Sequence, residues 1–227
     1  MQSIGDYVAD EYRGMHATTY WKPGSMKLLI FSDLHCHVEM AQSIVLRAED
    51  ADVIIGAGDF AQLRRGIEQT IDVLKEIARP TILVPGNSES LEELQQACHG
   101  WSAVHVLHGT GVSIDGVDFY GLGAAVPETP FGSWSYDLSE QEAGELLVNC
   151  PAGGVLVSHS PPKGVVDISS SGDSLGSVAV RETILAKSPQ LVVCGHIHES
   201  WEKTERLQDT TVVNAGPRGQ LVDLRSL

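Results

Sequence analysis

Short apolar runs alternate with amphipathic segments along most of the chain after Met26. The apolar runs have the length of buried strands, and the segments between them space their apolar residues as a helix does. The predicted strands are 27–32, 52–57 and 81–84, and the predicted helices are 39–49, 66–78 and 89–98, with Glu89 and Glu92 in the first turn of the last helix. This alternation is typical of βαβ units and predicts a parallel or mixed sheet.

After Gly100 the pattern shortens, which indicates a second sheet. Asp115-Gly116 is a hairpin signal between two of the next strands. The further predicted strands are 103–107, 111–114, 117–121, 154–158, 191–195, 200–206, 210–215 and 219–224, with helices near 139–149 and 177–187 and loops at 121–136 and 160–176.

Five of the apolar runs end abruptly in side chains that can bind metals. These side chains are Asp33, His35, Asp59, Asn87, His159, His196 and His198. Because an open α/β sheet binds ligands beyond the carboxyl ends of its strands, we expect them to gather at one edge. Gly58 and Gly86 let the backbone turn sharply before a ligand. His196-Ile-His198 presents both imidazoles on the same side if that segment is extended.

The seven side chains suggest a particular kind of ion. Imidazole nitrogens combined with carboxylate and amide oxygens suit Mn²⁺, Fe²⁺, Ni²⁺ or Zn²⁺. Seven donors exceed the needs of one ion but fill two sites if one carboxylate bridges them. The competing explanation is capping and hydrogen bonding at strand ends. We favour metal binding because it accounts for all seven residues at once.

Composition places these motifs in one domain. The chain has 227 residues, 42% of them hydrophobic, which is enough for a substantial core. Residues 1–25 differ from the rest in being rich in tyrosine, and a Pro23-Gly24 turn signal lies near their end, just before the first predicted strand. We therefore expect an N-terminal extension over 1–25 and a catalytic domain over 26–227. The extension is interpreted as a peripheral arm, with a dimer contact or an active-site flap as alternatives.

Charge and cysteine usage narrow the function classes. The formal net charge of −15 opposes non-specific binding to nucleic acids or anionic membranes. The four cysteines form no CxxC pair, so neither a zinc ribbon nor a disulfide framework is indicated. No apolar run is long enough to cross a bilayer, and the first residues lack the pattern of a signal peptide. These features predict a soluble cytoplasmic protein that does not bind membranes.

The ordered motifs resemble the signature of the calcineurin-like metallophosphoesterase family. They are Asp33-x-His35, Gly58-Asp59, Gly86-Asn87, His159 and Gly195-His196-x-His198, followed by an Asn214-Ala215-Gly216-Pro217 turn. The resemblance covers residues 27 to about 217. It implies an α/β fold, a four-layer αββα sandwich with two mixed β-sheets, and a dinuclear metal centre.

Carried over by position, the resemblance implies a role for each motif residue. Asp59 would bridge the two ions. Asp33, His35 and His198 would hold one ion, and Asn87, His159 and His196 the other. A hydroxide between the ions would attack phosphorus in line. Two divalent ions less two carboxylates leave about +2 in the crevice, which attracts phosphate to an acidic protein.

The sequence departs from the family after Asn87. Family members usually continue with His and an acidic residue, whereas this chain continues with Ser88 and Glu89. A serine hydroxyl donates a hydrogen bond but is not an acid near neutral pH. Acid–base assistance, typically ~10²–10⁴-fold, is therefore missing or supplied elsewhere. His37 and His108 are candidates, although a lone histidine is more often an ordinary surface or hydrogen-bonded residue.

Two other features of the sequence have two interpretations each. Phe131, Trp134 and Tyr136 form either an apolar wall for a leaving group or ordinary loop packing. Arg64 and Arg65 either clamp a phosphate or are solvated. The chain lacks the tyrosine of purple acid phosphatases, because that position is Gln62, and it lacks the GDxVDRG run of Ser/Thr protein phosphatases. It is most similar to the small single-domain bacterial and archaeal phosphoesterases.

The resulting hypothesis is a dinuclear metal-dependent phosphoesterase acting on phosphomono- or phosphodiesters of small molecules. Its catalytic residues would be Asp59, Asn87, Ser88 and His159. The expected partner is a small phosphorylated substrate. The sequence leaves open whether the protein forms a homo-oligomer. The first alternative is a catalytically weak binding or scaffold protein with this fold, as in the retromer complex. The second is a nuclease, which the net charge disfavours.

Overall fold

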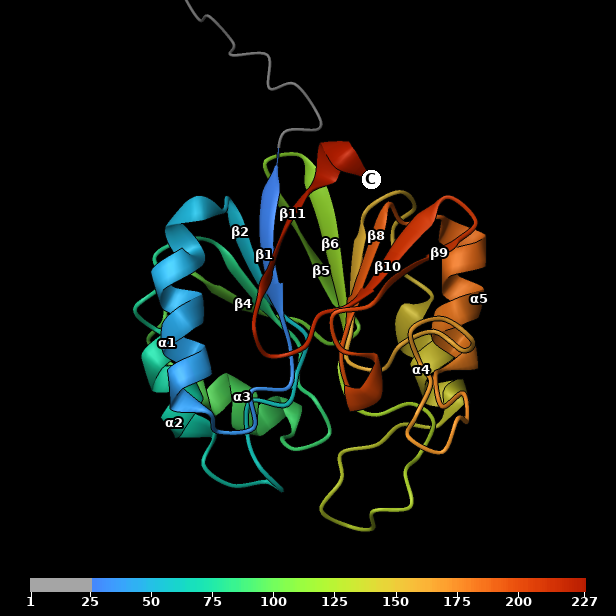
Figure 1. Ribbon diagram of the computed structural model, residues 1–227, viewed down its shortest axis with the longest axis horizontal. Coiled ribbons are helices and arrows are strands. Elements are labelled where there is room, and N and C mark those ends of the chain that lie inside the picture. Colours follow the sequence, from blue (N-terminus) through green and yellow to red (C-terminus); the bar gives the residue numbers. More distant parts are fainter. Residues whose placement is uncertain (1–25) are drawn as a thin grey trace, which may run out of the picture.

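Two mixed β-sheets pack face to face, with helices on both outer faces (Figure 1). The computed structural model describes residues 26–227, so the predicted extension over 1–25 lies outside the described residues. The four layers are helices, sheet, sheet and helices, which confirms the predicted αββα sandwich. Among residues 26–227, no helix is long and apolar enough to cross a bilayer.

The first sheet has the strand order β11-β1-β2-β3-β4. Its strands are β1 (Lys27–Phe31), β2 (Val53–Gly56), β3 (Thr81–Leu83), β4 (Val104–Val106) and β11 (Gln220–Asp223). Strands β1 to β4 are parallel to one another, and β11 pairs antiparallel with β1. The three strands that precede Asp33, Asp59 and Asn87 are therefore neighbours and end at the same edge.

The second sheet has the order β5-β6-β7-β8-β10-β9. Its strands are β5 (Thr110–Ile114), β6 (Val117–Leu122), β7 (Val155–Ser158), β8 (Leu191–Cys194), β9 (Thr204–Leu207) and β10 (Thr210–Asn214). The pair β5–β6 closes at Ile114 and Val117, which confirms the Asp115-Gly116 hairpin. Strands β7 and β8 are parallel, so the histidines that follow them emerge together.

The helices cover the outer faces of the sheets: α1 to α3 lie on the first and α4 and α5 on the second (Figure 1). They are α1 (Val38–Arg47), α2 (Ile67–Leu74), α3 (Leu91–Ala97), α4 (Glu140–Leu147) and α5 (Val178–Lys187), with 3₁₀ turns at Ala48–Asp50, His198–Ser200 and Leu224–Ser226. Helix α3 begins at Leu91 because Ser90 and Glu93 form a capping box. Glu89 consequently precedes the helix in which the sequence placed it.

Alternation along the strands supplies two hydrophobic cores to each sheet. In β1, Leu28 and Ile30 face the other sheet, while Leu29 and Phe31 face the helices. All four are fully buried. The central core between the sheets and the two outer cores hold the strand ends in fixed positions. Side chains beyond those ends are thereby presented by a rigid scaffold.

Two predictions about the strands were wrong in detail. The strand predicted at 103–107 was assigned to the second sheet, but β4 pairs with β3 in the first. The strand predicted at 200–206 begins only at Thr204, because a 3₁₀ turn and a tight turn occupy the preceding residues. In both cases a short run of residues with high β-propensity predicted a strand correctly. Tertiary structure determined which strand β4 pairs with and where β9 begins.

Candidate metal centre

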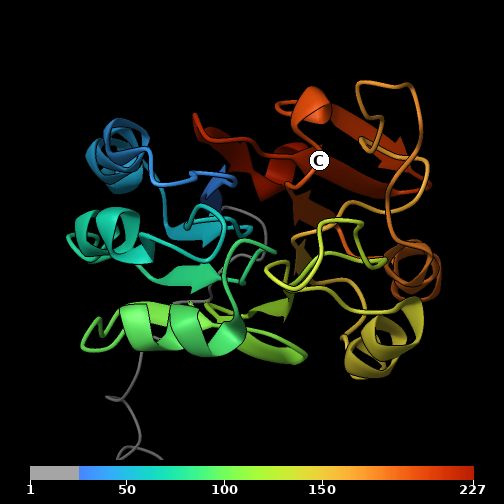
Figure 2. The same cartoon turned by 90° about the horizontal axis from the view of Figure 1, so that it is seen from below.

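The seven predicted donors lie together at the edge of the sandwich where β1, β2, β3, β7 and β8 end. Figure 2 shows the fold from the side of this edge. Four of them have left-handed backbone conformations, with φ of 54° at Asp33, 44° at His35, 59° at Asp59 and 67° at His196. Non-glycine residues seldom adopt this conformation, and it concentrates at functional sites. These left-handed residues lie just beyond the ends of β1, β2 and β8, where the donors gather.

Glycines allow these strand ends to approach one another. A Cβ at Gly86 would overlap the Asp59 carboxylate, and one at Gly195 would overlap that of Asp33. Gly58 has φ of +92°, as the expected sharp turn requires. At Gly86 a glycine is needed for close packing and not for a turn, because a side chain there would displace the carboxylate of Asp59, a predicted ligand.

The first group of donors contains Asp33, His35 and His198. The Nε2 atoms of the two histidines are 3.2 Å apart, and Asp33 Oδ1 lies 3.9 Å from His198 Nε2. His35 Nδ1 is 3.2 Å from the Ala61 carbonyl and donates to it. The Nε2 of His35 therefore carries a lone pair that points at the other donors. A backbone carbonyl that fixes the tautomer in this way is usual for metal-binding histidines.

The second group is centred on His159, which is fully buried. Its Nδ1 donates to the Ala57 carbonyl at 2.8 Å, so in the neutral ring Nε2 carries the lone pair. That Nε2 lies 3.2 Å from Asn87 Oδ1. The ring of His196 lies against it, with centroids 4.9 Å apart.

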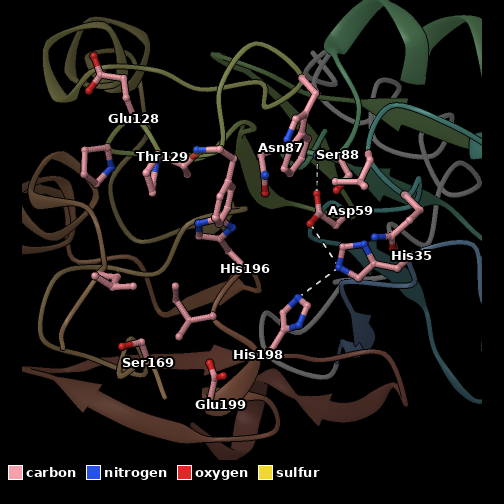
Figure 3. A pocket seen from close by; sticks show the side chains of 18 residues that line it. His35, Asp59, Asn87, Ser88, Glu128, Thr129, Ser169, His196, His198 and Glu199 are labelled. Atoms are coloured by element: carbon pink, nitrogen blue, oxygen red, sulfur yellow. Dashed lines mark hydrogen bonds and ion pairs between the residues drawn. The ribbon is translucent and has the colours of Figure 1, made fainter. Parts of the chain in front are cut away.

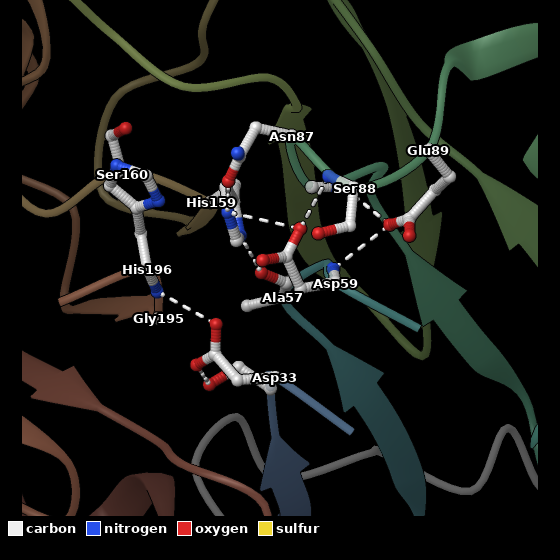
Figure 4. Close-up of polar contacts among 12 residues, drawn as sticks. Asp33, Ala57, Asp59, Asn87, Ser88, Glu89, His159, Ser160, Gly195 and His196 are labelled. Atoms are coloured by element: carbon white, nitrogen blue, oxygen red, sulfur yellow. Dashed lines mark hydrogen bonds and ion pairs between the residues drawn. The ribbon is translucent and has the colours of Figure 1, made fainter. Parts of the chain in front are cut away.

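Asp59 lies between the two groups. Its Oδ2 is 3.4 Å from His35 Nε2 (Figure 3), and its Oδ1 is 3.5 Å from His159 Nε2 (Figure 4). Nitrogen and oxygen donors thus converge on Asp59 from both sides. A divalent cation satisfies such an arrangement, so the donor set fits metal ions. Asp33 can join either of two sets of ligands. A donor atom of Asp33 lies within 4.8 Å of donor atoms of His35 and His198, and another set within 4.8 Å consists of Asp33, Asp59 and His159.

Burial and charge act against each other on the ionisable groups. Burial opposes the charged form of His159, but the carboxylates of Asp59 and Asp33 outweigh it and raise the pKa of this imidazole. Burial likewise opposes ionisation of Asp59, yet His159 and His35 lower its pKa below the ordinary value. Burial, followed by the charge of His159, lowers the pKa of His196 to about 3. The His196 ring is therefore neutral, as a ligand must be.

Glu89 is a functional residue that sequence reasoning placed in a helix. It is completely buried, and its carboxylate accepts hydrogen bonds from the backbone of Asp59 at 2.8 Å, Gly86 at 2.6 Å and Ala61 at 2.9 Å (Figure 4). Burial, together with repulsion from Asp59, raises its pKa to about 7. Glu89 thus joins the ends of β2 and β3. One feature of the sequence could have indicated this role: Glu89 lies two residues after Asn87, where the family carries an acidic residue.

Two further side chains orient the predicted ligands. Trp201 Nε1 donates to Asp33 Oδ2 at 2.9 Å, an oxygen that also accepts from Ser32 Oγ at 2.5 Å. Asn87 Nδ2 donates to Ser135 Oγ at 3.0 Å, which directs the amide oxygen of Asn87 toward His159. Sequence reasoning missed Trp201 and Ser135, because each is distant in the chain from the residue it holds.

The expectation for His196-Ile-His198 was wrong, because the segment is not extended. His196 is left-handed, and His198 begins a 3₁₀ turn. The two imidazoles therefore diverge. That of His196 lies against His159, and that of His198 lies against His35 at a centroid separation of 5.1 Å.

The remaining candidates occupy different positions. Ser88 is buried and lines the cavity beside the donors, and its backbone N–H donates to Asp59 Oδ1 at 2.8 Å.

His37 lines a neighbouring groove together with His35. His108 accepts from the Gly123 N–H at 3.0 Å, and its Nε2 is 3.4 Å from the Tyr136 hydroxyl. Burial lowers the pKa of His108. Arg64 pairs with Glu93 at 2.7 Å.

A cavity of about 500 Å³ opens beside the donors (Figure 3). His35, Asp59, Asn87 and His196 form one side of it. Segments around Glu128 and around Ser169 form the others. The size is that of a site for a small molecule.

Known proteins share this domain and this fold. The model of the calcineurin-like phosphoesterase superfamily domain matches residues 26–225. The protein TT1561 of Thermus thermophilus has a TM-score of 0.73 at 20% identity, over 89% of this chain and 96% of that one. A dimetal phosphatase from Danio rerio, LOC 393393, has a TM-score of 0.57 at 12% identity, over 86% and 88%.

The phosphopantetheinyl hydrolase PptH from Mycobacterium tuberculosis has a TM-score of 0.53 at 16% identity, over 86% of this chain and 92% of that one. The comparison with curated protein sequences gave no match. At these identities the structural likeness concerns the fold. The family model spans nearly all of the described residues, and the chain belongs to the calcineurin-like phosphoesterase superfamily.

Proposed function

We propose that the protein is a dinuclear metal-dependent phosphoesterase that hydrolyses phosphomono- or phosphodiesters of small molecules. The observation that carries this proposal is the convergence of lone pairs around Asp59. Its two carboxylate oxygens lie within 3.5 Å of the Nε2 atoms of His35 and His159, and both imidazoles direct Nδ1 toward a backbone carbonyl.

The geometry supports an assignment of the donors to two ions. Asp59 would bridge them, because its two carboxylate oxygens lie near one imidazole Nε2 of each group, His35 on one side and His159 on the other. The first ion would take Asp33, His35 and His198, and the second would take Asn87, His159 and His196. Mn²⁺, Fe²⁺, Ni²⁺ and Zn²⁺ all suit this mixture of imidazole, carboxylate and amide.

Divalent ions bound there supply positive charge for the phosphoryl oxygens and lower the pKa of a water nucleophile. The protein supplies the positions. Ser88 donates its backbone N–H to Asp59 Oδ1, which fixes the orientation of that carboxylate. The Ser88 hydroxyl lies at the cavity and can donate a hydrogen bond to a leaving oxygen without giving up its proton.

The net charge and the size of the cavity indicate the class of substrate. The net charge of −15 disfavours nucleic acids, and a small phosphorylated molecule fits the cavity of about 500 Å³. We propose a cytoplasmic location. Two proteins with the same fold are described as a dimetal phosphatase and a phosphopantetheinyl hydrolase, which is consistent with hydrolysis of a phosphate ester here.

One observation favours a second candidate function. Ser88 occupies the position at which the family usually carries a histidine, so the acid–base assistance of that histidine is missing or supplied elsewhere. A catalytically weak binding protein would retain the metal ligands and lack turnover.

The experiment compares turnover and metal content in the full-length chain. We expect the Mn²⁺-loaded protein to hydrolyse bis(p-nitrophenyl) phosphate or p-nitrophenyl phosphate. Asp59→Asn should lose both metal and turnover, whereas Asp118→Asn, an exposed position on β6, should retain both. Full metal content without turnover of either ester would support the binding protein and contradict the phosphoesterase.

A further inference from the structure

We propose that the cavity beside the metal centre binds an aromatic, uncharged ester group, so that the substrate is an aryl phosphate ester and not a polyphosphate. This inference rests on the proposed function, because it specifies the substrate of the same site.

The cavity has a metal side and an apolar side. On the metal side are the donors already described. The apolar side is formed by side chains from four separate segments: Leu63, Pro127, Pro130, Phe131, Trp134, Leu175 and Ile197. A group bonded to a phosphoryl group at the metal centre would therefore lie against apolar surface.

The aromatic part of this wall is a stacked pair. The rings of Phe131 and Trp134 are nearly parallel, with an interplanar angle of 9° and centroids 5.4 Å apart. Phe131 is 51% exposed, Leu63 48% and Leu175 48%, so about half of each side chain remains free for contact with a ligand. Exposed apolar side chains gathered at one place mark a binding site. Flat rings favour a flat aromatic partner.

The charge of the cavity excludes anionic ester groups. Among the described residues that line it there is no lysine or arginine, while Glu128 and Glu199 are both present. The guanidinium of Arg64 is paired with Glu93 and also donates to the Trp134 carbonyl at 3.4 Å. Further phosphates or a carboxylate on the substrate would therefore meet negative charge without compensation away from the metal centre.

A network of hydrogen bonds fixes the aromatic loop before any ligand binds. Asp137 accepts from the backbone and hydroxyl of Thr129, both at 2.9 Å, and from Ser135 Oγ at 2.5 Å. Ser135 in turn accepts from Asn87, a predicted metal ligand. The loop that carries the stacked pair is thus tied directly to the metal centre. A wall that is already in place loses little entropy on binding.

The positions of labelled residues in Figure 3 agree with this arrangement. Glu128 and Thr129 lie on one side of the opening, Ser169 and Glu199 on another, and His196 between them. An ester whose phosphoryl group is held near Asp59 would extend toward the 127–134 loop. Substrate selection would then depend on the ester group more than on phosphate contacts.

The test uses the full-length Mn²⁺-loaded protein and esters of phenols with similar acidity. The esters are phenyl phosphate, 2-naphthyl phosphate and the phosphate of 4-hydroxyphenylacetate. We expect kcat/KM to be about tenfold higher for the naphthyl ester than for the phenyl ester, since a hydrophobic pocket discriminates by such factors. The ester that carries a carboxylate should be the poorest of the three.

Two variants test the wall, and one controls for general effects. Phe131→Ala and Trp134→Ala should reduce the naphthyl preference to less than about threefold. Leu46→Ala removes a side chain that is 82% exposed on α1, away from the cavity, and should leave the preference unchanged. Thermal melts show whether each variant is folded. Because Phe131 is half exposed, its removal leaves the core intact.

Binding provides a readout that does not depend on turnover. Calorimetry with benzylphosphonate and 2-naphthylmethylphosphonate, which resist hydrolysis, should show the same preference and the same loss in Trp134→Ala. Equal values for the esters, or a preference that survives both wall variants, would overturn the inference. If no ester is hydrolysed while the naphthyl phosphonate still binds through Trp134, the cavity assignment is supported and the proposed hydrolysis is contradicted.

Discussion

Trp201→Phe isolates one hydrogen bond to a predicted metal ligand. The indole N–H donates to Asp33 Oδ2 at 2.9 Å, and the ring lies on His198 with centroids 4.3 Å apart. Phenylalanine retains an aromatic ring in this position and removes the donor. Asp33 keeps its bonds from Ser32 Oγ and from the His196 backbone, so the carboxylate stays in place but is less firmly oriented.

The expected effect is on metal affinity. A hydrogen bond to a charged group contributes about 1.5–3 kcal/mol, and about 1.4 kcal/mol corresponds to a tenfold change in a dissociation constant. Removing a residue that orients a ligand costs about 10–100-fold in metal affinity. Because Ser32 still donates to the same oxygen, we expect Trp201→Phe to weaken the ion at Asp33 by about tenfold.

A matched control makes the same chemical change elsewhere. Trp101 Nε1 donates to the Ile77 carbonyl at 2.9 Å in the core between the first sheet and its helices. Trp101→Phe should lower the free energy of unfolding and leave metal affinity unchanged. Competition with a chromogenic chelator for Mn²⁺ measures the affinity, and urea unfolding measures the stability. The reasoning is refuted if Trp201→Phe binds metal as tightly as the parent, or if both variants weaken binding equally.

Further predictions concern the supporting residues and the domain boundary. Glu89→Gln should change the pH dependence of unfolding of the metal-free protein: the raised pKa of Glu89 means that the folded state disfavours its carboxylate, so the parent should lose stability relative to the variant as pH rises from about 4.5 to about 7; parallel pH profiles of the two proteins in urea would argue against this role of Glu89. Ser88→His should raise turnover of alkyl monoesters more than that of p-nitrophenyl esters, whose leaving groups need no proton, and an equal response would contradict this. A chain beginning at Met26 should fold and bind metal, and loss of its cooperative thermal transition would show that residues 1–25 are structural.

The fold and the gathering of donors could be predicted because local signals and tertiary structure agree. Asp33, Asp59 and Asn87 each end an apolar run, and parallel strands bring such ends together whatever the details of pairing. The hairpin at Asp115-Gly116 was equally local. The αββα sandwich followed from the ordered motifs and their resemblance to a family.

The residues that orient the donors could not be predicted from local patterns. Trp201 is 168 positions from Asp33, and Ser135 is 48 from Asn87. Such partners depend on how loops close over the sheet ends. The wrong expectation for His196 and His198 has a related cause, since the period-two rule assumes an extended backbone that the left-handed His196 breaks.

The walls of the cavity were only partly visible in the sequence. Phe131 and Trp134 had two interpretations there, an apolar wall or ordinary loop packing. The structure shows them stacked and lining the cavity, and it places Tyr136 against His108 instead. The choice depended on a hydrogen-bonded network around Asp137, which no periodic pattern records.

The measurement that tests the central claim most directly is the metal content of the full-length chain at saturation. The proposed centre predicts two ions per chain in the parent, loss of both in Asp59→Asn, and loss mainly of one in His198→Ala, because the Asp59 carboxylate lies between the imidazoles of His35 and His159. A single ion per chain at saturation, with binding unchanged by Asp59→Asn, would contradict the dinuclear centre.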